Sequence, residues 1–346
     1  MEKHRIAING FGRIGRMVLR QAIIDKSFNV VAINASYPPE TLAHLIKYDS
    51  IHGRFEKEVK AHLDGIEVDG QFVKLVSQRN PELLPWKELG VDIVIEATGK
   101  FKTKDKASLH LEAGAQKVII TAPGKEIDGT FVIGVNENRY EADCHHIISN
   151  ASCTTNCLAP VVKVLDDYFG IKNGMMTTVH AFTNDQNNMD NPHNDLRRAR
   201  SCTQSIIPTS TGAAKAIGEV LPHLKGKLHG MALRVPTPNV SLVDLVVDLN
   251  QNVTAEEINR AFQKDAEGRL KGILDYSEEP LVSIDYTTTS SSSIIDGLST
   301  IVLEDKKVKV LAWYDNEWGY SCRVVDLARL VGNKLVNETI PSMSSS

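Results

Sequence analysis

The feature that most constrains the fold is a glycine-rich turn between a strand pattern and a helix pattern. Arg5–Asn9 form the strand pattern, Gly10–Gly15 the turn and Arg13–Lys26 the helix pattern. In a G-x-G-x-x-G turn, the first glycine permits the tight bend, the second lets the backbone approach a pyrophosphate, and the third lets the helix pack closely on the strand. The helix N-terminus presents free N–H groups to the anion. Because a second strand pattern ends near Asn34, the turn predicts a dinucleotide-binding unit.

Strand and helix patterns alternate through roughly the first 150 residues, which is typical of a parallel, doubly wound sheet. The strand patterns are short, rich in valine and isoleucine, and lie at Arg5–Asn9, Asn29–Asn34, Val91–Ala97, Lys117–Thr121 and His146–Ser149. Lys104–Ala113 supplies a second helical crossover. This part of the chain therefore predicts a Rossmann-type α/β domain.

The pattern changes from about Met175, where the strand patterns become longer and more alternating. They lie at Met175–Thr183, Lys227–Pro236, Val240–Leu249 and Lys307–Tyr314. Thr254 and Glu257 have the spacing of a capping box, which predicts a helix that begins at Thr254. Ser290–Ser293 predicts a loop, and the apolar residues after Trp318 predict a last helix. We expect a second domain with a mixed, largely antiparallel α+β architecture.

Composition narrows the possible functions. The formal net charge of −4 argues against electrostatic binding to nucleic acid. The start of the chain lacks the apolar core of an export signal, and no stretch approaches the ~18 apolar residues of a membrane span. The five cysteines are odd in number and form no CxxC pair, which argues against a disulfide scaffold or a zinc site. We expect a cytoplasmic protein without a metal site.

One cysteine stands where a helix should begin. The strand pattern ending at Ser149 leads through Cys153 into a run of helically spaced apolar residues, so the helix dipole favours a thiolate at Cys153. Cys157 lies one turn further in and is interpreted as a small packed residue. A thiolate nucleophile needs a group that moves protons. His180 ends a strand pattern and is a candidate, although spacing alone leaves a structural role open.

Several long, ordered motifs resemble the signatures of the glyceraldehyde-3-phosphate dehydrogenase family over nearly the whole chain. They lie at Ile8–Arg16, Ser149–Pro160, Asp195–Arg200, Ser205–Lys215, Arg234–Val240 and Trp313–Tyr320. The resemblance is to the phosphorylating enzymes, and in particular to the NADP-accepting, gluconeogenic bacterial type.

This resemblance implies the roles of Cys153 and His180. Cys153 attacks an aldehyde, and His180 lowers the pKa of the thiol as its ion-pair partner, then acts as base while hydride leaves for a nicotinamide. Inorganic phosphate resolves the thioester to an acyl phosphate. The resemblance also implies two oxyanion sites. Their residues are Thr183 and Arg234 for the substrate phosphate, Ser152, Thr154, Thr211 and Gly212 for the attacking phosphate, and Arg198 shared between them.

The resemblance further implies a nicotinamide cofactor, a homotetramer and a discontinuous cofactor domain. The predicted cofactor contacts are Gly10, Gly12, Arg13, Ile14, Asn34, Ala35, Arg79, Thr98, Gly99, Thr121 and Asn316. The loop Ala181–Cys202 is expected to pack across subunits. The C-terminal helix is expected to return to the first domain, so that residues 1–152 and 316–346 form the dinucleotide-binding domain and residues 153–315 the catalytic and substrate-binding domain.

Ala35 predicts a preference for NADP over NAD. An acidic residue about 20 residues after the glycine turn bonds the adenosine ribose in NAD-specific folds, and NAD-dependent relatives carry Asp here. Ala35 removes both that bond and the repulsion of a 2′-phosphate, to which Asn34 and Ser36 could donate. Pro192, as in NAD-type relatives, leaves open that Ala35 merely weakens NAD binding. An NADP preference would favour the reductive direction, toward sugar synthesis.

Two alternative functions fit parts of the sequence. An erythrose-4-phosphate dehydrogenase would share the motif around Cys153 but lack the Thr211–Gly212 pair, because water resolves its thioester; Trp318 favours this alternative. A non-catalytic binding protein on this scaffold would have lost its nucleophile or its partner, but Cys153, His180 and both groups of phosphate-site residues are present. We therefore expect reversible conversion of D-glyceraldehyde 3-phosphate to 1,3-bisphosphoglycerate.

Overall fold

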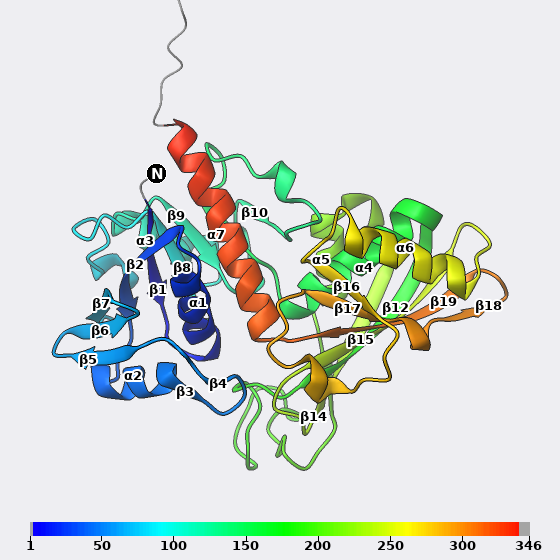
Figure 1. Ribbon diagram of the computed structural model, residues 1–346, viewed down its shortest axis with the longest axis horizontal. Helices are drawn as coiled ribbons and strands as arrows, with labels where there is room; N and C mark the ends of the chain where they lie inside the picture. Colours follow the sequence, from blue (N-terminus) through cyan, green and yellow to red (C-terminus); the bar gives the residue numbers. More distant parts are fainter. Residues whose placement is uncertain (1–2, 339–346) are drawn as a thin grey trace, which may run out of the picture. The chain divides into compact units, whose positions relative to one another are not determined.

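A computed structural model describes residues 3–338, so the residues 339–346 that were assigned to the dinucleotide-binding domain lie outside the described part. The chain divides into two compact units (Figure 1). Unit 1 comprises Met1–Phe131, Glu137–Ala151 and Ser321–Ser346, and unit 2 comprises Val132–Asn136 and Ser152–Tyr320. The functional domain boundaries expected from the sequence stay a prediction.

Unit 1 is built on a nine-stranded sheet with the order β10-β11-β9-β8-β1-β2-β7-β6-β5. Its strands are β1 (His4–Asn9), β2 (Phe28–Asn34), β5 (Val59–His62), β6 (Gly65–Val68), β7 (Gln71–Val76), β8 (Ile93–Glu96), β9 (Lys117–Ile120), β10 (Gly129–Thr130) and β11 (Ile147–Ser149). From β10 to β7 all neighbours are parallel, whereas β5, β6 and β7 form antiparallel hairpins at one edge. The predicted doubly wound sheet is confirmed; the antiparallel edge was not predicted.

Four helices and a short hairpin complete unit 1. They are α1 (Arg13–Ile24), α2 (Pro39–Lys47), α3 (Lys104–Glu112), the part of α7 (Trp318–Glu338) from Ser321 onward, and the hairpin β3 (Tyr48–Asp49) with β4 (Gly53–Arg54). In α7, Arg329 forms an ion pair with Asp25 at the end of α1, and Lys334 donates to the carbonyl of Tyr140. From Ser321 onward, the described part of α7 thus packs within unit 1.

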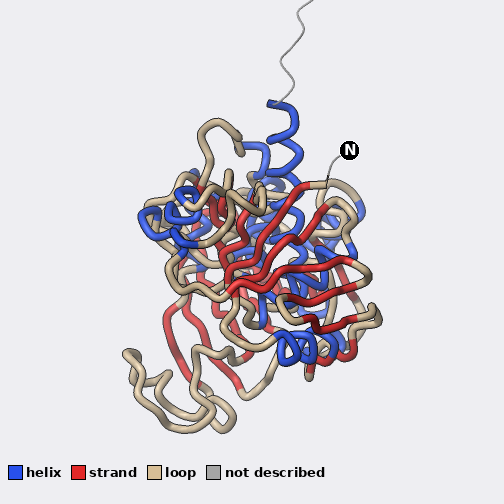
Figure 2. Tube along the Cα trace, turned by 90° about the vertical axis from the view of Figure 1, so that its left-hand side faces the viewer, coloured by secondary structure: helices blue, strands red, loops and turns tan. Residues whose placement is uncertain are grey.

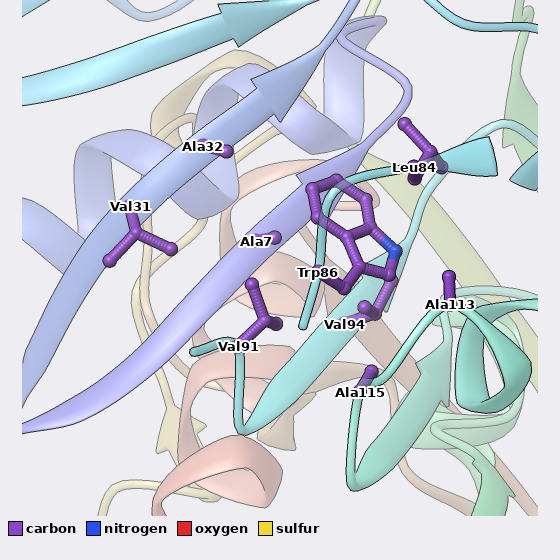
Figure 3. Packing of buried hydrophobic residues seen from close by; sticks show 9 residues of the cluster. All are labelled: Ala7, Val31, Ala32, Leu84, Trp86, Val91, Val94, Ala113 and Ala115. Carbon is purple, nitrogen blue, oxygen red and sulfur yellow. The ribbon is translucent and has the colours of Figure 1, made fainter. Parts of the chain in front are cut away.

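A buried polar network joins the strand ends of unit 1. Trp86 packs among small and branched side chains, including Ala7, Ala32 and Val94 (Figure 3). Its indole N–H donates to His110 Nδ1 at 3.0 Å, so the proton of the neutral ring lies on Nε2, which donates to Glu96 Oε2 at 3.1 Å.

The Glu96 carboxylate accepts further bonds from neighbouring segments. Asn9 Nδ2 donates to it at 2.5 Å, and Thr98 donates through its backbone N–H and its hydroxyl. Glu96 is 1% exposed, and its donors come from β1, α3 and the turn after β8. The network therefore fixes the carboxyl ends of two parallel strands and the loops that follow them.

Unit 2 contains an eight-stranded sheet with the order β13-β14-β12-β15-β19-β17-β16, and β18 paired with β19. The strands are β12 (Ile171–Ala181), β13 (Ile207–Ser210), β14 (Leu228–Val235), β15 (Ser241–Leu249), β16 (Leu274–Ser277), β17 (Ser293–Asp296), β18 (Ile301–Leu303) and β19 (Lys307–Tyr314). Only the pairs β12–β14 and β16–β17 are parallel. The expected mixed, largely antiparallel sheet is confirmed.

Three helices of unit 2, α4 (Cys153–Phe169), α5 (Ala213–Val220) and α6 (Ala255–Glu267), lie on one face of this sheet (Figure 1). The Thr254–Glu257 capping box is present. The predicted loop Ser290–Ser293 is wrong at its end, because Ser293 begins β17 and is buried. Residues 182–206 form the long loop between β12 and β13, drawn in tan at the lower left of Figure 2.

The short 3₁₀ helices are Pro81–Leu83, Glu137–Arg139, Pro222–Leu224, Ser283–Tyr286 and Gly297–Ser299. Within residues 3–338, no helix combines the length and the apolarity of a membrane span.

We predict that Glu96→Gln lowers the free energy of unfolding by about 2–4 kcal/mol, because an amide NH₂ would face donors that now meet a carboxylate. The measurement is the urea unfolding midpoint at fixed protein concentration. Glu88→Gln is the matched control, since Glu88 is exposed in the same unit. Equal unfolding midpoints for the two variants would show that the hydrogen bonds of Glu96 contribute little to the free energy of unfolding.

Candidate active site

The glycine turn of unit 1 leaves the N-terminus of α1 open. Gly10 has a φ of +95°, and a Cβ there would lie 2.7 Å from Thr98 N. A Cβ on Gly15 would collide with the carbonyl of Gly10, whereas one on Gly12 would meet nothing within 4 Å. Gly12 is the N-cap of α1, and no side chain in the described part of the chain caps it. The backbone at Gly12 is therefore accessible to a ligand, which fits a dinucleotide pyrophosphate.

The polar network holds several predicted cofactor residues. Thr98 is bonded to Glu96 through its N–H and its hydroxyl, and Gly99, with a φ of +71°, continues the turn. Thr121 donates from its hydroxyl to the carbonyl of Glu96 at 3.1 Å. Arg13 binds Asp49 through both terminal nitrogens. These hydrogen bonds place the residues at the carboxyl edge of the parallel strands, where ligands bind in open α/β sheets.

The hydrogen bonds of Asn34 overturn the expectation that its amide donates to the 2′-phosphate of NADP. Its amide donates to Asn9 Oδ1 at 2.6 Å and to the carbonyl of Gln78 at 2.7 Å, while its Oδ1 accepts from Gln78 N at 2.9 Å. Both amide hydrogens are thus used within the protein, and Asn34 has none left for a phosphate. The same bonds hold the segment before Arg79 beside the end of β2.

Ala35 and Arg79 are presented at this edge. The backbone N–H of Ala35 donates to Val76 at 2.9 Å, which extends the pairing of β2 with β7. Ser36 and Arg79 are exposed, and Arg79 has no ion-pair partner within residues 3–338. At this edge the hydroxyl of Ser36 and the guanidinium of Arg79 are therefore exposed, and Ala35 supplies no carboxylate.

In unit 2, Cys153 is the first residue of α4. Ser152 is the N-cap, and its hydroxyl accepts from Thr155 N at 3.0 Å. The preceding Ala151 adopts a φ of +55°, a conformation that a residue with a Cβ rarely takes and that turns the chain sharply from the sheet into the helix. Cys153 Sγ lies 3.5 Å from His180 Nε2. The predicted nucleophile and its histidine are thus brought together from α4 and β12.

A guanidinium lies on the other side of the histidine ring. His180 pairs with Arg234 across the parallel strands β12 and β14, and Arg234 Nη1 lies 2.7 Å from His180 Nδ1 and 2.9 Å from the carbonyl of Ala181. Nδ1 also lies 2.7 Å from the carbonyl of Ala181, so it either accepts from the guanidinium or donates to that carbonyl. His180 is 3% exposed.

The ion pair expected of Cys153 and His180 stays a prediction. Burial, and then the charge of Arg234, lower the pKa of His180 to about 3. Burial raises the pKa of the Cys153 thiol by more than Arg234 and the Thr154 N–H lower it. Burial raises the pKa of Cys157 to about 12, as suits a packed residue.

Several polar groups predicted to bind the attacking phosphate are already bonded within the protein. Thr154 is buried, its hydroxyl is bonded to Tyr314 Oη at 2.8 Å, and its backbone N–H acts on the Cys153 thiol, whose pKa it lowers. The Ser152 hydroxyl is shared with Thr155 at 2.7 Å. Thr211 and Gly212 precede α5, and the Thr211 hydroxyl accepts from Ala213 N at 3.2 Å. The hydroxyls of Ser152, Thr154 and Thr211 are thus each bonded within the protein.

Two further phosphate candidates lie in the long loop 182–206. Thr183 is held by Gln186 Oε1, which accepts from its N–H at 3.0 Å and from its hydroxyl at 3.3 Å. Arg198 forms an ion pair with Asp185 and donates from Nε to Thr209 at 2.9 Å. The charge of Arg198 lowers the pKa of Arg234 and the charge of Asp185 raises it. The loop therefore brings these groups near the catalytic pair.

Asn316 is linked to the strand that carries His180. Its Oδ1 accepts from Ser241 Oγ at 2.8 Å, and the same hydroxyl accepts from Ala181 N at 3.0 Å. The NH₂ end of Asn316 is thereby oriented away from Ser241. Sequence reasoning identified Asn316 through a motif but missed Ser241, since a single serine at the start of a strand pattern gives no signal.

Tyr314 was also missed as a site residue. It is 1% exposed, bonds to Thr154 and to Thr178 at 2.8 Å each, and lies edge-on to His180 with ring centroids 5.9 Å apart. It ends the strand pattern Lys307–Tyr314, where an aromatic residue is ordinary. Only the pairing of β12, β15 and β19 brings it beside the catalytic pair.

Comparisons with known proteins agree with this geometry. Two protein-family models match the chain: "Glyceraldehyde 3-phosphate dehydrogenase, NAD binding domain" over residues 4–104, and "Glyceraldehyde 3-phosphate dehydrogenase, C-terminal domain" over residues 152–316. The chain is 68% identical over 333 residues to glyceraldehyde-3-phosphate dehydrogenase 2 of Bacillus subtilis, which covers 96% of this chain and 98% of the relative.

Two staphylococcal relatives are similar over comparable lengths. Glyceraldehyde-3-phosphate dehydrogenase 2 of Staphylococcus epidermidis is 63% identical over 94% of this chain and 95% of the relative, and that of Staphylococcus aureus is 61% identical over 98% and 99%. The chain belongs to the glyceraldehyde-3-phosphate dehydrogenase family.

Proposed function

We propose that this chain catalyses the reversible oxidative phosphorylation of D-glyceraldehyde 3-phosphate to 1,3-bisphosphoglycerate through a thioester on Cys153, with NADP as the preferred cofactor. The observation that carries the proposal is the 3.5 Å approach of Cys153 Sγ to His180 Nε2 at the start of α4. A cysteine at a helix N-terminus beside a histidine is an activated nucleophile, and family membership identifies the reaction class.

In the proposed reaction, Cys153 Sγ bonds to the aldehyde carbon and His180 handles the proton. The backbone N–H of Cys153 and the ring N–H of His180 stabilise the oxyanion of the thiohemiacetal. The bound nicotinamide supplies the hydride acceptor, and the amide of Asn316 would hold its carboxamide. His180 takes the hydroxyl proton, which leaves an acyl group on sulfur. Inorganic phosphate then attacks that carbon and Cys153 leaves as a thiolate.

Arginine guanidinium groups and backbone N–H groups would hold the two phosphates. Arg234 is partly buried beside the nucleophile, and its buried Nε has no acceptor within the described residues. An unsatisfied guanidinium donor favours an incoming oxyanion, since a buried donor without a partner costs about 1–3 kcal/mol. We assign the substrate phosphate to Arg234 and Thr183, the attacking phosphate to the N–H groups around Thr154 and Gly212, and a shared role to Arg198.

We also propose a homotetramer in the cytoplasm. Alternate residues of β12 and β14 face the helices, while their neighbours leave apolar side chains exposed on the other face of the sheet. Met175 is 74% and Met231 42% exposed on this face. Exposed apolar side chains gathered on one face are typical of an interface between subunits.

Cys153 should be alkylated by iodoacetate well before Cys157, because Cys157 is 0% exposed and its pKa of about 12 leaves almost no thiolate at neutral pH. Mass spectrometry of the labelled peptides measures the order. Cys144 is exposed and provides the reference for an unactivated thiol. Cys153→Ser should abolish aldehyde oxidation and retain cofactor binding; comparable turnover in that variant would remove the thioester from the mechanism.

Oxidation of glyceraldehyde 3-phosphate should depend on inorganic phosphate or arsenate if Thr211 and Gly212 serve the attacking anion. Erythrose 4-phosphate should be a poor substrate. The measurement is kcat/KM for both sugars with and without phosphate. Equal values without phosphate dependence would transfer the assignment to erythrose-4-phosphate dehydrogenase.

NADP should be preferred to NAD, because Ala35 presents no carboxylate to the 2′-phosphate while Ser36 and Arg79 are exposed beside it. The measurement is kcat/KM for each cofactor at saturating aldehyde and phosphate. Ala35→Asp should shift the ratio toward NAD, and Arg79→Gln should reduce kcat/KM for NADP more than for NAD. A tenfold advantage of the unaltered enzyme for NAD, about 1.4 kcal/mol, would refute the preference.

A further inference from the structure

Three buried hydroxyls are bonded to one another beside the nucleophile. Tyr314 Oη lies 2.8 Å from Thr154 Oγ1 and 2.8 Å from Thr178 Oγ1. Thr154 follows Cys153 in α4, and Thr178 lies two residues before His180 in β12. The exposed fractions are 4% for Thr154, 1% for Thr178 and 1% for Tyr314, so solvent water does not compete for these bonds. The proposed reaction gives the three hydroxyls no joint role.

The directions of these hydrogen bonds depend on one another, because each hydroxyl has only one proton to donate. The Thr154 hydroxyl lowers the pKa of the Cys153 thiol, which a hydroxyl does by donating to the thiolate. When the Thr154 proton is directed at sulfur, the Tyr314 proton must be directed at Thr154 Oγ1. Thr178 must then donate to Tyr314 Oη. Burial raises the pKa of the Tyr314 phenol, so the proton in the middle of this sequence is retained.

We propose that Thr178, Tyr314 and Thr154 form a hydrogen-bond chain that ends on the Cys153 sulfur and orients the Thr154 hydroxyl toward it. A thiolate attracts a donor more strongly than a neutral hydroxyl does, so the charge on sulfur sets the direction of the chain. Each donor polarises the next one, which strengthens the last bond. Tyr314 is thus a positioning residue that acts through Thr154. The inference rests on the proposed role of Cys153 as the nucleophile.

The chain stabilises the sulfur wherever it carries negative charge in the proposed reaction. That is the case before Cys153 attacks the aldehyde, and again when it leaves the acyl group as phosphate attacks. All three hydroxyls keep their protons throughout, so the chain transfers no proton. Thr178 contributes without touching Cys153. By donating to Tyr314 Oη, it occupies the acceptor to which the Thr154 proton would otherwise turn.

The titratable and charged groups of the described residues that act on Cys153 lie on four elements. His180 Nε2, from β12, lies 3.5 Å from Sγ, and Arg234 acts from β14. Tyr314 acts from β19 and Cys157 from the next turn of α4. Variants that exchange one neutral side chain for another leave these charges in place. A shift of the thiolate midpoint in such variants therefore reports a hydrogen bond.

The test is the pH dependence of Cys153 alkylation by iodoacetamide, a neutral reagent that the charge of Arg234 does not steer. Mass spectrometry of the labelled peptide gives the rate at each pH. Tyr314→Phe keeps the ring that lies edge-on to His180. We expect its alkylation midpoint to rise by about one pH unit, which lowers the thiolate fraction about tenfold below the midpoint. Thr178→Val should raise the midpoint by about half a unit, and Thr178→Ser, which keeps the hydroxyl, should not move it.

Thr177→Val is the matched control, because Thr177 is the neighbour of Thr178 in β12 and its side chain projects from the opposite face of the sheet. Its midpoint should equal that of the unaltered enzyme. Thr178→Val, which preserves the shape of the side chain, carries the test if Tyr314→Phe fails to fold. Unmoved midpoints in Tyr314→Phe and Thr178→Val, or a Thr178→Ser variant that behaves like Thr178→Val, would overturn the chain.

The turnover of glyceraldehyde 3-phosphate is measured on the same preparations, because it separates this inference from the proposed function. Absent turnover by the unaltered enzyme would count against the proposed function. Normal turnover by the unaltered enzyme together with unmoved midpoints in the variants would count against the chain alone.

Discussion

The Glu96 carboxylate is the constraint on which the cofactor side of this protein depends. It is buried at the end of β8 and accepts donors from β1, from α3 and from the turn that follows its own strand. A buried carboxylate is tolerated only when its oxygens are bonded. Because those bonds come from separate segments, each segment is fixed relative to the others. Asn9 also accepts a hydrogen bond from Asn34. Asn34 in turn donates to the carbonyl of Gln78 and so holds the segment before Arg79.

On the catalytic side, the corresponding constraint is the register of two parallel strands. β12 and β14 pair so that His180 lies opposite Arg234. Side chains of directly paired residues project from the same face of a sheet, and here that face is covered by α4. The helix begins at Cys153, so the thiol meets the histidine on one side while the guanidinium meets it on the other. The functional consequence is that Cys153 and Arg234 act on opposite ring nitrogens of one imidazole.

Much of the fold was predictable because local patterns and tertiary structure agree. The strands β1, β2, β8 and β9 are short and buried on both faces, so they read as continuous apolar runs. The strands β12 and β15 alternate because helices cover only one face of their sheet. The hairpins β5–β7 were missed, since β5 is mostly exposed and the three strands lack a clear apolar period. Ser293 was missed because a run of serines resembles a loop even where its last member is buried in a strand.

The sequence by itself determined the glycine turn, the position of the nucleophile at a helix start, and the family, because each depends on residues that are close together in the chain. It could not determine which hydrogen bonds those residues have left to offer. The structure showed that Asn34 and the Thr154 hydroxyl are used within the protein, and it brought Tyr314 and Ser241 to the site. Only the tertiary structure decided that Arg234 lies against Nδ1 of His180, because that contact depends on strand register, which no local pattern of residues encodes.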